Sequence, residues 1–104
     1  MSSQTTVIAP EGDLDIATVK DFRHTVLEAA DNSPAGLVVD LTGVDFIDST
    51  GLGAVLEAHQ RMRTESRFVG VVAPPGSSAA LILNLSGLGD KLNIFESRSE
   101  ALAV

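Results

Sequence analysis

The chain has 104 residues, of which 44% are hydrophobic, so it can form one domain that buries a core without disulfides or metals. It contains no cysteine, which excludes a disulfide framework, a thiolate metal site and a cysteine nucleophile. The net charge is −7 and the seven basic residues are scattered, which disfavours nucleic acid as a partner and favours a protein with a basic surface.

The chain opens with a short strand and a helix. An apolar run at residues 7–9 predicts a very short strand that ends in a turn at residues 10–12, Pro-Glu-Gly. Over residues 16–30 the apolar positions recur at spacings of three and four, which predicts an amphipathic helix. Asp13 and Asp15 are available to cap its first turn, and an Asn-Ser-Pro sequence ends it.

A second strand and a second helix follow. The continuous run at residues 36–41, Gly-Leu-Val-Val-Asp-Leu, predicts a strand that is covered on both faces. Helices are therefore expected on both sides of the sheet. After a turn at Thr42-Gly43, residues 44–47 alternate weakly before an amphipathic helix that begins near Thr50.

His59 lies on the apolar stripe of that helix, together with Leu52, Val55, Leu56 and Met62. A histidine among aliphatic residues is more often a core residue with a satisfied nitrogen than a ligand or a base, because histidine chemistry depends on a partner that tunes it. No second histidine is near in the sequence. A core role is therefore favoured, and the other histidine offers no stronger case for chemistry.

The last third of the chain continues the alternation. Residues 68–73 predict a second buried strand, and a helix with a serine cap is expected over residues 77–85. A short last strand is predicted at residues 92–95. A terminal helix is expected over residues 97–104, where a serine and a glutamate three residues later have the spacing of a capping box.

Strands that alternate with helices indicate an α/β fold, with a sheet that is at least partly parallel and right-handed crossovers. We expect a single domain over residues 1–104, in which a mixed sheet of about four strands is flanked by about four helices. No stretch approaches the ~18 consecutive apolar residues of a membrane span, and the start has no secretory pattern. A cytoplasmic protein without membrane association is expected.

The most informative stretch is Asp48-Ser49-Thr50-Gly51-Leu52-Gly53, at the predicted start of the second helix. A helix N-terminus has backbone N–H groups without intrahelical partners and the positive end of the macrodipole, so it favours an anion such as a phosphate. Ser49 is therefore a candidate phosphate acceptor. The alternative is that Asp48 or Ser49 only caps the helix, since both residue types are preferred there.

Gly51 and Gly53 are unfavourable inside a helix, where each costs ~1 kcal/mol relative to alanine. Two factors can offset this cost. One is close packing of the helix on the sheet, and this interpretation is favoured. The other is a partner protein that needs unobstructed backbone beside Ser49.

Motifs of catalysis and nucleotide binding are absent. The residues around Ser49 do not form Gly-x-Ser-x-Gly, and neither a Gly-x-Gly-x-x-Gly fingerprint nor a Walker loop occurs. Asp13, Asp15, Asp45 and Asp48 offer a carboxylate pair or a magnesium site, but their spacing matches no such pattern, and caps or solvated turns are favoured. We therefore expect no enzymatic activity, no metal and no cofactor.

The chain resembles the STAS domain family, and specifically the anti-sigma factor antagonists of bacteria. The resemblance covers nearly the whole chain and rests on residues 12–15, 37–53 and 85–88. Its central motif runs from Asp48 to Gly53, where an aspartate, two hydroxyl residues, a glycine, an aliphatic residue and a second glycine follow a strand and open a helix.

This resemblance implies a partner switch. The unphosphorylated protein binds an anti-sigma factor serine kinase and releases the sigma factor, phosphorylation at Ser49 ends that binding, and a PP2C-type phosphatase restores it. Thr50 is implied to stay unmodified. The implied partner-binding surface consists of the acceptor and its neighbours, Asp13, Asp15, Asp45, Asp48, Ser49, Thr50, Gly51, Leu52 and Gly53.

One departure from the family lies at the start of the chain. Members usually have a further strand ahead of residue 7, which is missing or very short here. The sheet is then expected to expose an edge or to borrow a strand from another chain, which predicts self-association as a homodimer. Two alternative functions stay open. They are a STAS scaffold module of a transporter or lipid-transport complex without a phosphate cycle, and a small nucleotide-binding protein.

Overall fold

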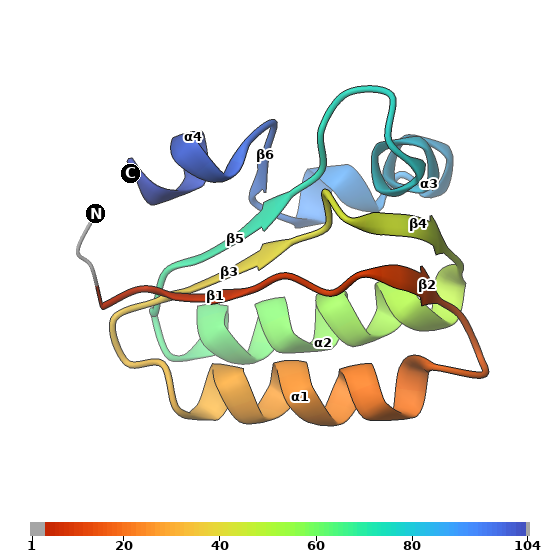
Figure 1. Ribbon diagram of the computed structural model, residues 1–104. Helices are drawn as coiled ribbons and strands as arrows, with labels where there is room; N and C mark the ends of the chain where they lie inside the picture. The colour runs from red at the N-terminus through yellow and green to blue at the C-terminus, as the bar shows by residue number, and fades with distance from the viewer. Residues whose placement is uncertain (1–3, 104) are drawn as a thin grey trace.

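A four-stranded sheet in the order β1-β3-β5-β6 forms the centre of the protein (Figure 1). The computed structural model describes residues 4–103. The strands are β1 (Thr6–Ile8), β3 (Leu37–Asp40), β5 (Val69–Val72) and β6 (Ile94–Phe95). The predicted four-stranded sheet is confirmed, but within the described residues its pairing is parallel rather than mixed, because each strand is joined to the next through a helical crossover.

A two-stranded parallel sheet of β2 (Gly12–Leu14) and β4 (Val44–Ile47) extends the first. In Figure 1, β2 continues the line of β1 toward the right-hand end of the molecule. The sequence predicts a turn at residues 10–12 and misses β2. Pro10 has no N–H to donate and Gly12 has a φ of +82°, so pairing is interrupted there and resumes with β4 in place of β3. The register of the β2–β4 pairing shifts between Gly12 and Asp13.

Helices cover both faces of the sheet, as predicted. α1 (Val19–Asp31) and α2 (Ser49–Thr64) lie side by side beneath the sheet in Figure 1, and α4 (Arg98–Leu102) lies above it. α3 (Ser78–Ser86) packs against β4 and is followed by a 3₁₀ turn, η1 (Leu88–Lys91). Between residues 4 and 103, no helix has the length and apolar character needed to cross a membrane.

Two hydrophobic clusters occupy the two faces of the sheet. The larger lies between the sheet and the α1–α2 layer and includes Leu37 and Val39 of β3. The smaller consists of Val38, Val72 and Ala101 and lies under α4. Neighbouring residues of β3 therefore face opposite clusters, which explains the continuous apolar run in its sequence.

The start of α1 differs from the prediction. The helix begins at Val19 rather than Ile16, and neither predicted aspartate caps it, because Asp13 lies in β2 and Thr18 occupies the cap position. The Asp15 carboxylate accepts the backbone N–H groups of the two residues before α1 at 3.0 and 3.2 Å. The Asp15 carbonyl oxygen also accepts the N–H of Val19 at 2.8 Å, so this turn leads directly into α1, and Ile16 within it is 79% exposed.

The serine caps predicted for the last two helices are confirmed. Ser77 Oγ accepts the N–H of Ala80 at 3.1 Å, and Ser97 Oγ accepts the N–H of Glu100 at 3.2 Å. The Glu100 carboxylate accepts the N–H of Glu96 rather than that of Ser97, so the reciprocal half of the capping box is displaced by one residue.

His59 is a buried core residue, as predicted. It is 2% exposed, and its Nε2 accepts the backbone N–H of Asn93 at 3.0 Å. Burial, together with the nearby charge of Arg63, lowers the pKa of His59. The ring is therefore neutral at pH 7 and joins α2 to the segment that leads into β6.

Acidification below about pH 6.5 is expected to destabilise the fold through His59. In the unfolded chain this histidine is protonated near pH ~6.5, whereas in the folded chain it is protonated only at a lower pH. The free energy of unfolding therefore falls as the pH falls. Denaturant titrations at about pH 7.5 and about pH 5.5 measure this loss. His59→Gln keeps an acceptor for Asn93 and should lose less, while the exposed His24→Gln should match wild type. Equal losses in wild type and His59→Gln would contradict this account.

Candidate functional site

Asp48 opens α2 and acts as its N-cap. Its Oδ1 accepts the backbone N–H groups of Thr50 at 2.9 Å and Gly51 at 3.1 Å. Hydrogen bonds from the Thr50 hydroxyl and from the N–H groups of Gly51, Thr50 and Ile16 hold the pKa of Asp48 below its usual value. The carboxylate is therefore charged at pH 7. The capping role that the sequence left open between Asp48 and Ser49 belongs to Asp48.

Ser49 and Thr50 differ in how their hydroxyls are engaged. Thr50 Oγ1 donates a hydrogen bond to Asp48 Oδ1 at 2.5 Å. Ser49 is exposed, and across residues 4–103 its hydroxyl has no hydrogen-bond partner. Ser49 is also the first residue of α2, at the positive end of the helix dipole. Of the two hydroxyls, the one that is accessible and unengaged is that of Ser49.

The two glycines of the motif have different environments. A Cβ on Gly51 would lie 2.5 Å from the carbonyl oxygen of Leu14 and 2.9 Å from its Cβ, so α2 approaches β2 too closely for a side chain at this position. A Cβ on Gly53 would meet nothing within 4 Å. Close packing therefore explains Gly51, whereas Gly53 is exposed and its Cβ position is open space.

Two members of the predicted partner-binding set are buried. Leu52 is 2% exposed and belongs to the larger core cluster, and Gly51 lies against Leu14. The helical period turns both residues toward the sheet, while Ser49 and Gly53 face outward. Leu52 and Gly51 therefore hold α2 against the sheet, and their contribution to partner binding stays a prediction.

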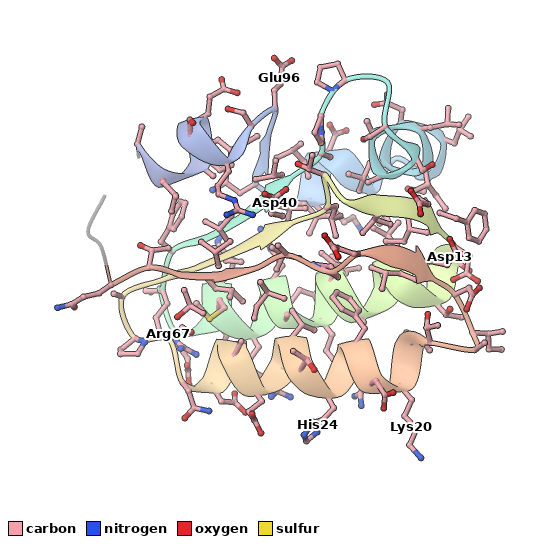
Figure 2. All side chains as sticks on the ribbon, in the orientation of Figure 1. Asp13, Lys20, His24, Asp40, Arg67 and Glu96 are labelled. Carbon is pink, nitrogen blue, oxygen red and sulfur yellow. The ribbon has the colours of Figure 1, made fainter. Side chains whose placement is uncertain are left out.

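The four aspartates of the predicted surface lie on different elements. Asp13 is exposed in β2, at the right-hand end of the view in Figure 2. Asp45 is exposed in β4, Asp15 closes the turn before α1, and Asp48 caps α2. In the described part of the chain, they do not form a group that could hold a metal ion. They instead give the surface around Ser49 a negative charge.

The surface around Ser49 also has exposed apolar residues, which the sequence pattern does not reveal. Phe46 is 50% exposed and Ile16 is 79% exposed. The sequence contains no signal for Phe46, since strict alternation after the polar Asp45 would place it in the core. The register of the β2–β4 pairing shifts at this point, and Asp45 and Phe46 are both exposed. Ile16 gives no signal either, since it fits the apolar period of α1.

Asp40 is a second acidic group with an altered pKa, and it lies beside a cavity of about 510 Å³ at the carboxyl ends of the strands (Figure 2). Burial alone would raise the pKa of Asp40, but hydrogen bonds from Thr42 and the ion pair with Arg98 outweigh it and lower the value. Oδ1 accepts the Thr42 N–H at 2.9 Å, and Oδ2 accepts Arg98 Nε at 2.8 Å. Both oxygens are engaged, so Asp40 fastens α4 to β3.

Comparison with known proteins relates the chain to one family and to several of its members. The model of the STAS domain family matches residues 2–101. Among characterised proteins, the chain is 29% identical over 96 residues to the anti-sigma-F factor antagonist RsfB of Mycobacterium tuberculosis. That alignment covers 92% of this chain and 77% of RsfB.

Solved structures share the fold. The crystal structure of an anti-sigma factor antagonist from Mycobacterium paratuberculosis is 23% identical, with a TM-score of 0.83 over 99% of this chain and 86% of that chain. The anti-sigma factor antagonist SpoIIAA in its unphosphorylated form is 22% identical, with a TM-score of 0.74 over 97% of this chain and 87% of that chain. SpoIIAA of Bacillus in its phosphorylated form, also 22% identical, gives a TM-score of 0.70 over 98% of this chain and 91% of that chain.

Proposed function

The chain belongs to the STAS domain family, and on that basis we propose that it is an anti-sigma factor antagonist. In its unphosphorylated form it binds an anti-sigma factor that is a serine kinase, and this binding releases the sigma factor. Phosphorylation of Ser49 ends the binding, and a PP2C-type phosphatase restores it. The chain acts in the cytoplasm, where transcription takes place, as a binding protein and not as an enzyme.

The unengaged hydroxyl of Ser49 at the first position of α2 is the observation that carries this proposal. A kinase must bring the γ-phosphate of ATP to an accessible hydroxyl, and the neighbouring Thr50 hydroxyl is engaged with Asp48. The names of related proteins also support a phosphorylated anti-sigma factor antagonist. RsfB is named as an antagonist of an anti-sigma factor, and SpoIIAA has been solved in a phosphorylated form.

The electrostatics of the site support a switch. A phosphate on Ser49 adds about −1.5 to −2 charges, and it does so beside Asp45 and Asp48 in a chain whose net charge is already −7. A partner that accepts a small neutral hydroxyl would have to desolvate a dianion next to two carboxylates. The dipole of α2 favours negative charge by about 0.3–1 kcal/mol, so the fold itself is expected to tolerate the modification.

We expect the anti-sigma serine kinase encoded in the same genome to add one phosphoryl group to the purified chain and none to Ser49→Ala. Intact-mass measurement after incubation with MgATP reads the modification. Thr50→Val removes the neighbouring hydroxyl and should remain a substrate, which makes it the matched control. Modification that persists in Ser49→Ala would contradict the site assignment.

Related measurements separate the alternative functions. A scaffold module of a transporter or lipid-transport complex needs no acceptor, so an unmodified chain that binds such a complex stably would favour that role. A nucleotide-binding protein would bind ATP or GTP on its own in a calorimetric titration. The proposed function predicts neither result, because the nucleotide belongs to the kinase.

A further inference from the structure

Large apolar side chains are exposed around the start of α2 and on the neighbouring helix α3. Across residues 4–103 the exposed large hydrophobic residues are Ile16 at 79%, Phe46 at 50%, Leu81 at 61% and Leu85 at 78%. Ile16 lies near the phosphorylation motif, because Leu14, two residues before it, accepts the backbone N–H of Asp48 at 3.1 Å. Leu81 and Leu85 come from α3, and the proposed switch at Ser49 does not account for them.

One face of α3 is fixed against β4. Ser78 Oγ donates a hydrogen bond to the Asp45 carbonyl oxygen at 2.6 Å. Ser78, Leu81, Ile82 and Leu85 have the spacing i, i+3, i+4 and i+7, so they share one face of the helix. Ile82 is partly buried against the core, whereas Leu81 and Leu85 are exposed. The apolar face of α3 therefore begins at β4 and continues outward from it.

Phe46 is exposed in β4, next to the residue to which α3 is hydrogen-bonded. Ile47 faces α2, since its Cγ1 would lie 3.0 Å from a Cβ on Gly51. Ile47 is 3% exposed whereas Phe46 is 50% exposed, so the Phe46 side chain is not part of the core that Ile47 shares with α2. Figure 1 shows α2 below β4 and α3 above it. Phe46 therefore lies in the short segment that joins the two sites: it follows Asp45, whose carbonyl oxygen accepts the Ser78 hydroxyl of α3, and it precedes Ser49 by three residues.

We infer that the outer face of α3 forms a second part of the surface that binds the anti-sigma kinase, an inference that rests on the proposed function. Leu81 and Leu85 are the side chains that a partner would cover. A surface helix normally carries polar residues at its exposed positions, whereas two of the four exposed residues of α3, Leu81 and Leu85, are large and apolar. Exposed apolar surface that adjoins a binding site is typical of a protein interface.

The charges near the exposed leucines of α3 indicate which kind of partner would cover them. The exposed acid Asp45 lies next to α3, since its carbonyl oxygen accepts the Ser78 hydroxyl, and the exposed Asp13 pairs with Phe46 in the β2–β4 sheet. Asp48 follows Phe46 by two residues, and α3 itself contains no charged residue. The complementary surface is apolar with lysine or arginine at its rim. A second copy of the chain would bring the same carboxylates against these, so the occupant is a basic-rimmed protein and not another copy.

The test uses the purified kinase from the phosphorylation experiment as the probe. The double substitution Leu81→Ser and Leu85→Ser is expected to raise its Kd for the chain about tenfold or more in a calorimetric titration, because covering two exposed leucine side chains removes apolar area from water that serine side chains do not have. The KM for phosphorylation of Ser49 should rise to a similar degree, while a saturating amount of the variant still receives one phosphoryl group. His24→Ser changes an exposed residue of α1, on the opposite side of the molecule from α3 in Figure 2, and should bind as wild type does.

Three outcomes are distinguishable. Unchanged affinity of a double variant that still unfolds cooperatively would overturn the role of α3 and leave Ser49 phosphorylation intact. Failure of the wild-type chain to be phosphorylated would overturn the proposed function instead. Sedimentation of wild type as a dimer that the double substitution dissociates would assign the patch to a second copy and would overturn the inference. If the double variant does not fold, Leu85→Gln alone repeats the measurement.

Discussion

Replacing Gly51 with alanine is expected to lower the free energy of unfolding by about 3 kcal/mol. The new methyl group would lie 2.5 Å from the carbonyl oxygen of Leu14 and 2.9 Å from its Cβ, so α2 or β2 would have to move. Helix propensity acts in the opposite direction and favours alanine by ~1 kcal/mol, so the measured loss is a net value. Denaturant unfolding followed by circular dichroism measures it.

Gly53→Ala is the matched control, because it makes the same chemical change two residues further along α2. No atom lies within 4 Å of the added Cβ, so this variant is expected to gain about 0.5–1 kcal/mol of stability. A gain or no change for Gly51→Ala would contradict the close approach of α2 and β2. If Gly53→Ala is more stable but binds the kinase less tightly, the open backbone beside Ser49 is part of the recognition surface.

Phosphorylation of Ser49 is expected to raise the Kd for the anti-sigma kinase about 100-fold or more, since an uncompensated charge in an interface costs about 2–5 kcal/mol. The new dianion would stand beside Asp45 and Asp48, and the partner would have to desolvate all three groups together. Calorimetric titration of the kinase with the separated phosphorylated and unphosphorylated chains measures the difference. The difference in Kd between the two forms should become smaller at high salt, because salt screens the contribution of the exposed charges.

Two substitutions at Ser49 calibrate this result. Ser49→Ala should bind the kinase as the unmodified chain does, because it carries no charge. Ser49→Asp carries one charge and should lose a smaller part of the affinity, with stability within about 1 kcal/mol of wild type, as is usual at an exposed position. Phosphorylated chain that binds as tightly as unmodified chain would refute the switch.

The sheet was largely predictable because its central strands have a local signature. β3 and β5 are buried on both faces, so their sequences are continuous apolar runs that differ from the periodic helices. β2 lacks this signature. It has three residues, Gly-Asp-Leu, and its pairing with β4 depends on contacts with a segment about thirty residues away.

The site was predictable to the extent that its residues are adjacent in the sequence. Asp48, Ser49 and Thr50 form one cap, so their order alone indicates the start of α2. The difference between Gly51 and Gly53 depends on the backbone of Leu14, and a linear sequence does not contain that distance. The exposure of Leu81 and Leu85 likewise depends on how α3 packs against β4. The spacing of apolar residues in a helix does not by itself indicate which of them are covered by other elements.

The Asp48 cap determines what a phosphate on Ser49 could reach. Its carboxylate holds the N–H groups of Thr50 and Gly51, and its carbonyl oxygen accepts the N–H of Leu52 at 2.9 Å. A phosphate would find these donors occupied and would stay hydrated outside the first turn. The phosphorylated and unphosphorylated forms would then have the same fold and differ only in the phosphoryl group on Ser49. The rate of switching between them would be set by the kinase and the phosphatase, because the domain itself has no refolding step.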